Sequence, residues 1–228
     1  SSEKIKLFAY SIAHDLKNPA LGIFGVTKLL QKHYVDSLDE RGRKYCMTIL
    51  KAAEQVDTLV GQINEYISTN ELPLSIERTH FKELFRTVKE DFSSQLNRRQ
   101  VHWSEPEYLP EINADRLSIL RAIRNLVDNA LKYGGNKLSK IEIGYQDSGD
   151  YHVLSVKDDG IGLKEEEHEG LFAAFVRKGT SRGIAGTGIG LTIVKEIAEK
   201  HKGKVWLELN RSNGMTFCMS ISKNLRAS

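Results

Sequence analysis

The sequence of 228 residues has few cysteines, few prolines and no long apolar run. Its two cysteines, Cys46 and Cys218, lie in apolar patterns, so we expect two buried free thiols and no disulfide framework. No apolar stretch approaches the roughly 18 residues that a membrane-crossing helix needs, and no secretory signal pattern is present. These features permit the reducing cytoplasm, and we predict no direct membrane contact within this chain.

An excess of one sign of charge is also lacking. The chain has 33 Lys and Arg residues against 30 Asp and Glu residues, which leaves a formal net charge of +3. Because the basic residues are spread along the chain and form no basic face, no nucleic-acid partner is predicted. Hydrophobic residues make up 40% and charged residues 28% of the sequence, which excludes a disordered chain and predicts a packed core.

Glycine is absent from one long stretch and concentrated in another. None of the 18 glycines lies between Gly61 and Gly134, whereas 12 lie from Gly134 to Gly190. Since glycine allows the backbone to approach a neighbour closely, this distribution predicts a helical part followed by a loop-rich part that contacts a ligand.

Residues 3–31 and 39–69 carry apolar residues at three- and four-residue steps, which predicts two long amphipathic helices. The stripe of the first helix consists of Ile5, Phe8, Ile12, Leu16, Ile23, Val26 and Leu30, and that of the second consists of Tyr45, Ile49, Ala52, Val56, Leu59, Ile63 and Tyr66. Asp36, Ser37 and Asp39 indicate a turn and an N-cap between the helices. Because a hairpin alone cannot bury a whole stripe, we predict a homodimer that forms a four-helix bundle.

The helical pattern breaks at Asn70–Pro73, which predicts a first domain at 1–70 and a second domain at 71–228. Hairpin strands and three helices predict an α+β sandwich for the second domain. The predicted strands are Leu74–Arg78, Val101–Ser104, Ile141–Gln146, His152–Lys157, Lys204–Leu209 and Met215–Ser220, and the predicted helices are Phe81–Asn97, Asp115–Tyr133 and Leu191–His201.

Two glycine-rich segments of the second domain are candidates for ligand contact. Residues 157–163 (KDDGIGL) follow a strand, where an aspartate can accept a hydrogen bond from an exocyclic amine. Residues 186–191 (GTGIGL) open a helix, and the first N–H groups of a helix form an anion site. Each segment alone has low specificity, because the first also occurs in ordinary turns and the second in simple connectors. A dinucleotide-binding loop would need a preceding strand, which is missing here.

The helix predicted at Asp115–Tyr133 has an unusual polar face. Asn125, Asn129, Lys132 and Tyr133 share one side of the helix at steps of four, three and one residues. Asparagine is a poor residue for a helix interior, so two on one face suggest a function. Carboxamide oxygens suit a hard cation such as Mg²⁺, and a lysine suits phosphate. The alternative is an ordinary solvated face.

Five motifs follow one another along the chain. They are HDLKNP at 14–19, NLVDNA at 125–130, DDGIG at 158–162, FAAF at 172–175 and GTGIGL at 186–191. In this order and spacing they resemble the H, N, G1, F and G2 boxes of the transmitter core of two-component sensor histidine kinases. The resemblance extends from about Ile5 to Ile221.

The resemblance implies a dimerisation and histidine-phosphotransfer hairpin followed by a Bergerat-type ATP-binding domain with a mixed sheet and three main helices. It implies that His14 is autophosphorylated from ATP with Mg²⁺. The phosphoryl group would then pass to an aspartate on the receiver domain of a response regulator, and dephosphorylation of that regulator is a further implied activity. The chain would be the cytoplasmic part of a sensor whose parent protein can be membrane-bound.

Residue by residue, the resemblance assigns His14 as the phosphoacceptor and Asp15 as the acid that receives the imidazole proton. Asn18 matches the position that orients a water during dephosphorylation of the partner. Counting 100° per residue, His14 points away from Ile12 and Leu16, so we expect an exposed imidazole.

In the second domain, the resemblance implies that Asn129 coordinates Mg²⁺, with Asn125 one turn earlier. Its other assignments to the nucleotide site are Lys132 and Tyr133 at the phosphates and nucleotide, Asp158 at the adenine with Gly160 and Gly162 giving close approach, Phe175 beside the ATP lid, Arg177 near the terminal phosphate, and Gly186, Thr187, Gly188, Gly190 and Leu191 at the phosphate-facing hinge.

Three rival functions remain at this point. The first rival is a related ATPase or protein-serine kinase, which would need no phosphoacceptor hairpin. Hydrolytic relatives also carry a glutamate base at the position of Asn125. The amide of Asn125 cannot take a proton from water, which argues against hydrolysis. A catalytically degenerate dimeric scaffold would be expected to lack His14, Asn129 or Asp158, and all three are present. A nicotinamide-dependent enzyme would need a parallel sheet.

Overall fold

The computed structural model describes residues 2–162, 170–172, 188–209 and 214–226. The chain folds into two compact units, and the division falls between Ser68 and Thr69. The first unit is helical and the second combines helices with β-strands.

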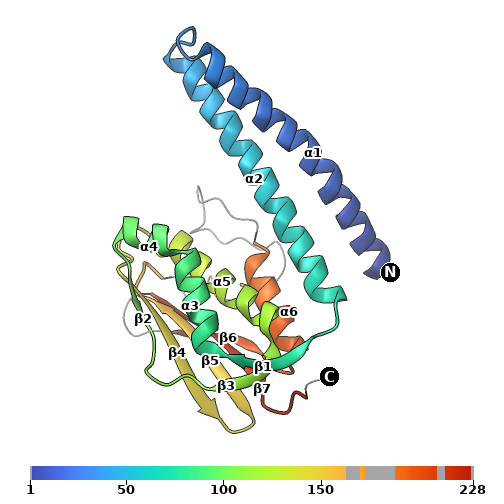
Figure 1. Cartoon of the computed structure of the whole chain (residues 1–228), viewed down its shortest axis with the longest axis vertical. Coiled ribbons are helices and arrows are strands. Elements are labelled where there is room, and N and C mark those ends of the chain that lie inside the picture. Colours follow the sequence, from blue (N-terminus) through green and yellow to red (C-terminus); the bar gives the residue numbers. More distant parts are fainter. Residues whose placement is uncertain (1, 163–169, 173–187, 210–213, 227–228) are drawn as a thin grey trace. The chain divides into compact units, whose positions relative to one another are not determined.

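The first unit is an antiparallel hairpin of two long helices (Figure 1). Helix α1 runs over Ser2–Tyr34 and helix α2 over Glu40–Glu71, so the last three residues of α2 already belong to the second unit. Asp39 caps α2, because its Oδ1 accepts the N–H of Gly42 at 2.7 Å. The N-cap predicted at this turn is therefore confirmed.

The hairpin buries one row of side chains and leaves a neighbouring apolar row exposed. The buried residues are Ala13, Ala20 and Thr27 on α1 and Cys46, Leu50, Ala53, Val60 and Ile67 on α2. Ile23 of the predicted stripe is 52% exposed, and Leu16, Val26 and Leu30 are exposed as well. The expected stripe is thus not the row that one chain buries. Residues three apart on a helix lie about 60° apart, so both rows belong to one wide apolar face.

The second unit contains a five-stranded mixed sheet with helices on one face (Figure 1). The strand order is β2-β4-β5-β7-β6, with β2 parallel to β4 and the other pairs antiparallel. These strands are β2 His102–Ser104, β4 Lys140–Ser148, β5 Tyr151–Asp158, β6 Val205–Leu209 and β7 Met215–Ser222. Strands β1 Ile76–His80 and β3 Glu111–Asp115 form a separate antiparallel pair. The helices are α3 Phe81–Asp91, α4 Ser93–Arg99, α5 Arg116–Tyr133 and α6 Gly190–Lys200.

Two local expectations are corrected. The predicted helix at Phe81–Asn97 is two helices, because the backbone of Phe92 leaves the helical region with φ −98° and ψ 3°. The strand β3 was missed because it is only five residues long, although its polar and buried apolar residues alternate. It matters for the site because its last residue, Asp115, caps α5.

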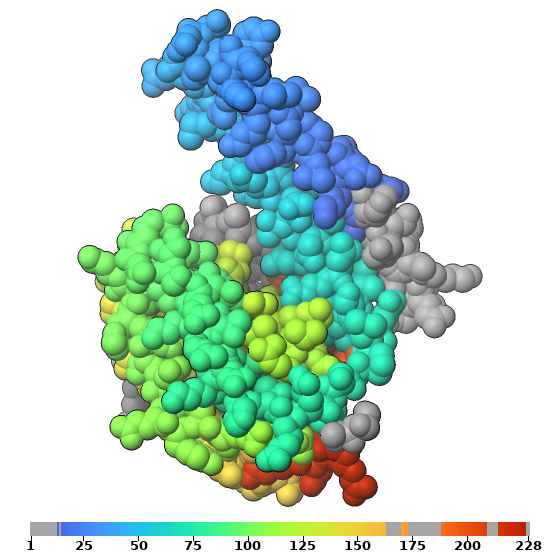
Figure 2. Space-filling view, in the orientation of Figure 1, coloured from blue at the N-terminus to red at the C-terminus, as the bar shows by residue number. Residues whose placement is uncertain are grey.

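The core of the second unit lies between the sheet and helices α3, α5 and α6. Its fully buried large side chains include Phe81, Phe85, Ile123, Ile141 and Ile197. Figure 2 shows α3 and α4 covering the outside of this unit, with part of α5 reaching the surface beside them. Both cysteines are buried and free, as predicted, and burial raises the pKa of the Cys218 thiol to about 12. No helix in the described ranges is apolar enough over sufficient length for a membrane crossing.

Candidate functional site

Helix α5 carries the polar face that the sequence singled out. The Asp115 side chain caps its N-terminus by accepting the N–H of Ser118 at 2.8 Å, and Gly134 ends it. Eight residues of α5 are buried: Ile119, Leu120, Ala122, Ile123, Leu126, Val127, Ala130 and Leu131. Asn125, Asn129, Lys132 and Tyr133 are only partly buried. The predicted amphipathic helix is confirmed, and its polar residues are left for other contacts.

Asn125 brings α5 against the start of α6. Its Nδ2 donates to the carbonyl oxygen of Arg121 at 3.0 Å, which orients the side-chain amide. Its Oδ1 lies so close to Gly190 that a β carbon added there would be 2.7 Å away. A larger residue at position 190 would meet the carboxamide of Asn125, which explains why α6 begins with a glycine.

The start of α6 is the described part of the 186–191 motif. Gly188 has φ +74°, a left-handed conformation that favours glycine, and Ile189 is buried. The N-cap residue Ile189 provides no side-chain hydrogen bond to the first turn. Leu191 is half-buried. The unpaired N–H groups of a helix start form an anion site, and here that site lies beside Asn125.

The loop after β5 packs onto the end of α5. A β carbon on Gly160 would lie 2.4 Å from the Cα and 2.6 Å from the carbonyl oxygen of Gly134. The N–H of Ile161 donates to that same oxygen at 3.1 Å. Gly162 has φ +67° and rests against the backbone of Gly214. The glycines of the 158–162 motif are required by contacts within the protein as well as by any ligand.

Asp158 is a buried acid at the end of β5. Its side chain is 4% exposed and accepts the N–H of Gly160 at 2.9 Å. Burial raises its pKa from 3.8 to about 6, and hydrogen bonds from the backbone of Gly160 and Met215 oppose the rise. A buried carboxylate of this kind is suited to accept a hydrogen bond from a ligand amine.

Lys132 is held by an acidic neighbour on its own helix. Its Nζ lies 2.6 Å from Oδ2 of Asp128, and both side chains are about one third exposed. A phosphate that recruits Lys132 would have to compete with this i,i+4 ion pair, which contributes only about 0.3–0.5 kcal/mol. Breaking this ion pair so that Lys132 can bind a phosphate therefore requires little free energy.

Two residues that support the site were given no role by the sequence analysis. Arg99, at the end of α4, donates to the carbonyl oxygens of Leu131 and Gly135 and so fixes the C-terminal end of α5. Asp159 accepts the N–H groups of Ser139 and Lys140, each at 2.9 Å. Burial alone would raise the pKa of Asp159, but hydrogen bonds from the Ser139 hydroxyl and from these two N–H groups hold it below its ordinary value. Asp159 stood inside a motif without an assigned role.

The remaining predicted residues fall in two groups. Phe175, Arg177, Gly186 and Thr187 lie outside the described residues. His14, Asp15 and Asn18 lie on α1, where Asp15 and Asn18 are exposed and the backbone alone is described for His14. Phe172 of the FAAF motif contacts Phe217 of β7 edge-to-face, with 6.3 Å between ring centroids.

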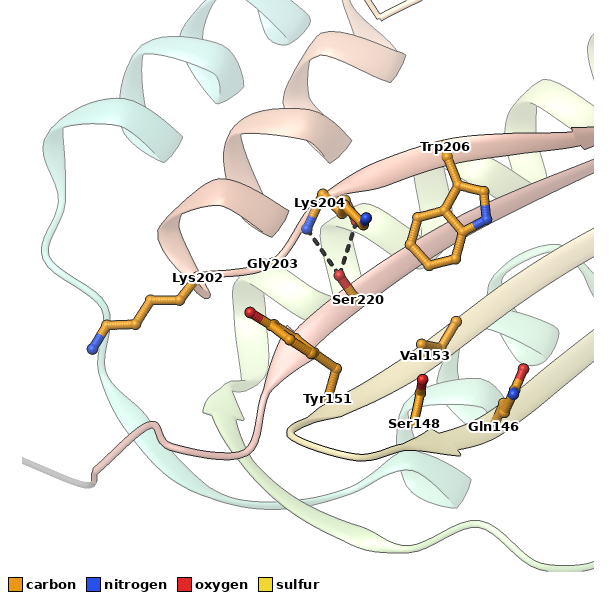
Figure 3. Close-up of a pocket in the computed structure, with 9 residues that line it drawn as sticks. All are labelled: Gln146, Ser148, Tyr151, Val153, Lys202, Gly203, Lys204, Trp206 and Ser220. Atoms are coloured by element: carbon orange, nitrogen blue, oxygen red, sulfur yellow. Dashed lines mark hydrogen bonds between the residues drawn. The ribbon is translucent and has the colours of Figure 1, made fainter.

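A groove of about 550 Å³ opens elsewhere, on the sheet between Tyr151, Trp206 and Ser220 (Figure 3). Val153 and Ser220 pair across β5 and β7 and alternate with the buried Leu154 and Met219, so this groove is on the face that the helices do not cover. None of its lining residues is a predicted site residue. The site around α5 is distinct from it.

Two family models match the chain. Residues 4–70 match the His Kinase A (phospho-acceptor) domain, and residues 114–225 match the histidine kinase-, DNA gyrase B- and HSP90-like ATPase. The solved catalytic domain of histidine kinase ThkA is 31% identical, with a TM-score of 0.58 over 66% of this chain and 97% of that domain. The chain belongs to the sensor histidine kinases. The family resemblance and the predicted two-part fold are confirmed.

Two further relatives extend over nearly the whole transmitter core. Cyanobacterial phytochrome B of Nostoc sp. is 30% identical over 97% of this chain, which spans 30% of that relative. ThkA in complex with the response regulator protein TrrA is 29% identical, with a TM-score of 0.66 over 94% of this chain and 60% of that one. The chain thus spans about a third or less of the curated relatives first matched. A parallel nicotinamide-binding sheet is excluded for the described residues, since only β2 and β4 pair in parallel.

Proposed function

We propose that this chain is the catalytic core of a sensor histidine kinase that transfers the γ-phosphoryl group of ATP to His14. The observation that carries the proposal is the meeting of three motifs around α5. Asn125 contacts Gly190 at the start of α6, and Gly160 contacts Gly134 beside the buried Asp158. One end of this arrangement suits phosphates and the other suits a purine amine.

Asp158 would accept the hydrogen bond of the adenine amine, and the first N–H groups of α6 would bind the phosphates. Lys132 would leave Asp128 to contact a phosphate oxygen. Arg177, Gly186 and Thr187 are assigned here by the family resemblance alone, as is Phe175. The protein's main contribution to phosphoryl transfer is to position the groups and to stabilise charge, because the reaction has little covalent chemistry for it to perform.

The carboxamides fit Mg²⁺. Asn125 donates through Nδ2 to Arg121, so its Oδ1 remains an acceptor beside Gly190, and Asn129 lies one turn further on the same face. Oxygen donors of this kind suit Mg²⁺, which retains several waters and bridges phosphates. When bound, the ion would neutralise charge on the phosphate oxygens. Asn125 and Asn129 would hold it.

At the hairpin, the imidazole nitrogen of His14 attacks the γ-phosphorus while the bond to the ADP leaving oxygen breaks, and Asp15 accepts the imidazole proton. The phosphoryl group then passes to an aspartate of a response-regulator receiver domain in the cytoplasm. Asn18 would orient the water that reverses this modification. The exposed apolar row at Leu16, Ile23 and Leu30 supports a homodimeric four-helix bundle.

The test is incubation of the purified chain with γ-labelled ATP and Mg²⁺. We expect a protein-bound label that is labile in acid and stable in base, as a phosphohistidine is. His14→Gln should abolish the label, and Asn129→Asp should reduce it strongly. A label that persists in His14→Gln would overturn the phosphoacceptor assignment, and full activity of Asn129→Asp would overturn the metal assignment.

A further inference from the structure

The segment that follows α2 is fastened to the second unit at two points. The first anchor is Lys200, the last residue of α6. Its Nζ donates to the carbonyl oxygens of Thr69 and Leu72, each at 2.6 Å. The last carbonyls of a helix have no partner within it, and a lysine ammonium satisfies them well. Thr69 is 5% exposed, so this residue of α2 is also buried against the second unit.

The second anchor is Asp115, which lies between β3 and α5. Its Oδ1 accepts the N–H of Ser118 and its Oδ2 accepts the N–H of Ser75 at 2.7 Å. Burial alone would raise its pKa, but the N–H donors of Ser118 and Ser75 hold the pKa below its ordinary value. One carboxylate therefore caps α5 and fixes the chain just before β1.

His201 joins the two anchors. Its side chain is fully buried next to Lys200, and its Nε2 accepts the N–H of Asp115 at 3.1 Å. Its Nδ1 lies 2.7 Å from the carbonyl oxygen of Ile197, so Nδ1 carries the proton and the ring is neutral. Burial lowers its pKa, in agreement with a neutral ring. In Figure 1 the chain between α2 and β1 passes beside α6 at this place.

We propose that Lys200 and Asp115 clamp residues 69–75 onto the ATP-binding domain, so that this domain pivots within α2, before Thr69. The sequence break at Asn70–Pro73 predicted only a domain boundary within this segment. The inference rests on the proposed function, in which the nucleotide must reach His14. Lys200 and Asp115 are positioning residues, because neither is part of the nucleotide site.

The clamp has a kinetic consequence. Releasing residues 69–75 would turn the end of a helix into a flexible connector and widen the set of positions that the ATP-binding domain samples. The effective concentration of ATP at His14 then falls. The nucleotide site itself is unchanged, so kcat for autophosphorylation should fall while KM for ATP stays constant.

The test compares wild type, Lys200→Met, Lys200→Arg and Lys195→Met in the full chain. Lys195→Met is the matched control, because Lys195 is on the same helix and pairs only weakly with Glu199 at 3.8 Å. In Lys200→Met we expect amide exchange in residues 69–76 to rise about 10-fold and kcat to fall about 3- to 10-fold at constant KM. Lys200→Arg, which keeps the donors, should restore both, and the control should match wild type.

Unchanged exchange in Lys200→Met would overturn the clamp. Faster exchange with unchanged kcat, or a raised KM, would overturn the positioning role. The exchange measurement needs no ATP, so it still decides the clamp if wild type forms no phosphohistidine, an outcome that would instead refute the proposed function.

Discussion

Gly160 and Gly134 touch backbone to backbone. An added β carbon at Gly160 would lie 2.4 Å from the Cα of Gly134, and the neighbouring Ile161 N–H donates to the Gly134 carbonyl oxygen at 3.1 Å. The end of α5 and the loop after β5 are therefore one rigid piece. This contact keeps the buried Asp158 at a fixed place relative to Asn129 and Lys132, which is what a site that binds both ends of a nucleotide requires.

The first prediction concerns Gly160→Ala. The methyl group has no space against the Gly134 backbone, so we expect a loss of about 1–3 kcal/mol in the free energy of unfolding. Affinity for a non-hydrolysable ATP analogue should fall as well, since the loop must move. Urea unfolding and calorimetric titration measure the two effects.

The matched control for that variant is Gly149→Asn. Gly149 has φ +59°, which asparagine tolerates, and an added β carbon there meets no atom within 4 Å. This control should stay within about 0.5 kcal/mol of wild type. Equal stability of Gly160→Ala and Gly149→Asn would contradict the contact.

The second prediction follows from the raised pKa of Asp158. An acid with a higher pKa in the folded than in the unfolded state contributes stability below its ordinary pKa of 3.8, and this contribution is lost as pH rises through about 6. Asp158→Asn should therefore stabilise the ligand-free chain by about 1–3 kcal/mol at pH 7.5 and by less at pH 5. It should also weaken binding of the ATP analogue, because an amide N–H₂ would face the adenine amine.

The neighbouring Asp159→Asn serves as the contrast. The pKa of Asp159 is lowered, so its ionised form stabilises the fold above its ordinary pKa, and the substitution should destabilise the chain at pH 7.5. Thermal unfolding at the two pH values distinguishes the variants by sign. The same sign for both would refute the assignment of Asp158 as a destabilising buried charge.

The third prediction concerns the ion pair between Lys132 and Asp128. Lys132→Met should lower affinity for the ATP analogue about 10-fold through the lost phosphate contact. Asp128→Asn should raise it about 2-fold, because the lysine no longer has to leave a carboxylate. Both variants should unfold within about 0.5 kcal/mol of wild type, since the pair is partly exposed. Weaker binding in Asp128→Asn would show that Asp128 itself takes part in the site.

Much of this site could be predicted because its parts are short motifs with a local cause. The sequence predicted α5 at Asp115–Tyr133, and Asn125 and Asn129 stood out as asparagines inside that helix. Contacts between segments that are distant in the sequence could not be predicted. Nothing in the local pattern relates Arg99 to Gly135, or Lys200 to Thr69, because the fold alone brings them together.

The apolar stripe of the hairpin shows a similar limit of sequence analysis. Periodicity identifies the apolar side of a helix but not which part of a wide side meets which neighbour. Ala20 and Thr27 are small, and they are the residues buried in the hairpin, whereas the bulkier Ile23 and Leu30 remain exposed. The apolar row that the periodicity identified, with Ile23 and Leu30, therefore remains exposed in one chain and is available to contact a second chain.

The last prediction tests that surface. Ile23→Lys places a charge in the exposed apolar row, and burying an unpaired ammonium in a bundle is costly. We expect the dimer dissociation constant to rise at least about 10-fold, measured by sedimentation equilibrium. The matched control is Lys32→Glu, which changes a charge on the opposite side of α1 and should leave dimerisation unaltered. Because one chain does not bury Ile23, the helical content of Ile23→Lys should persist. An unchanged dissociation constant in Ile23→Lys would show that dimerisation uses a different surface.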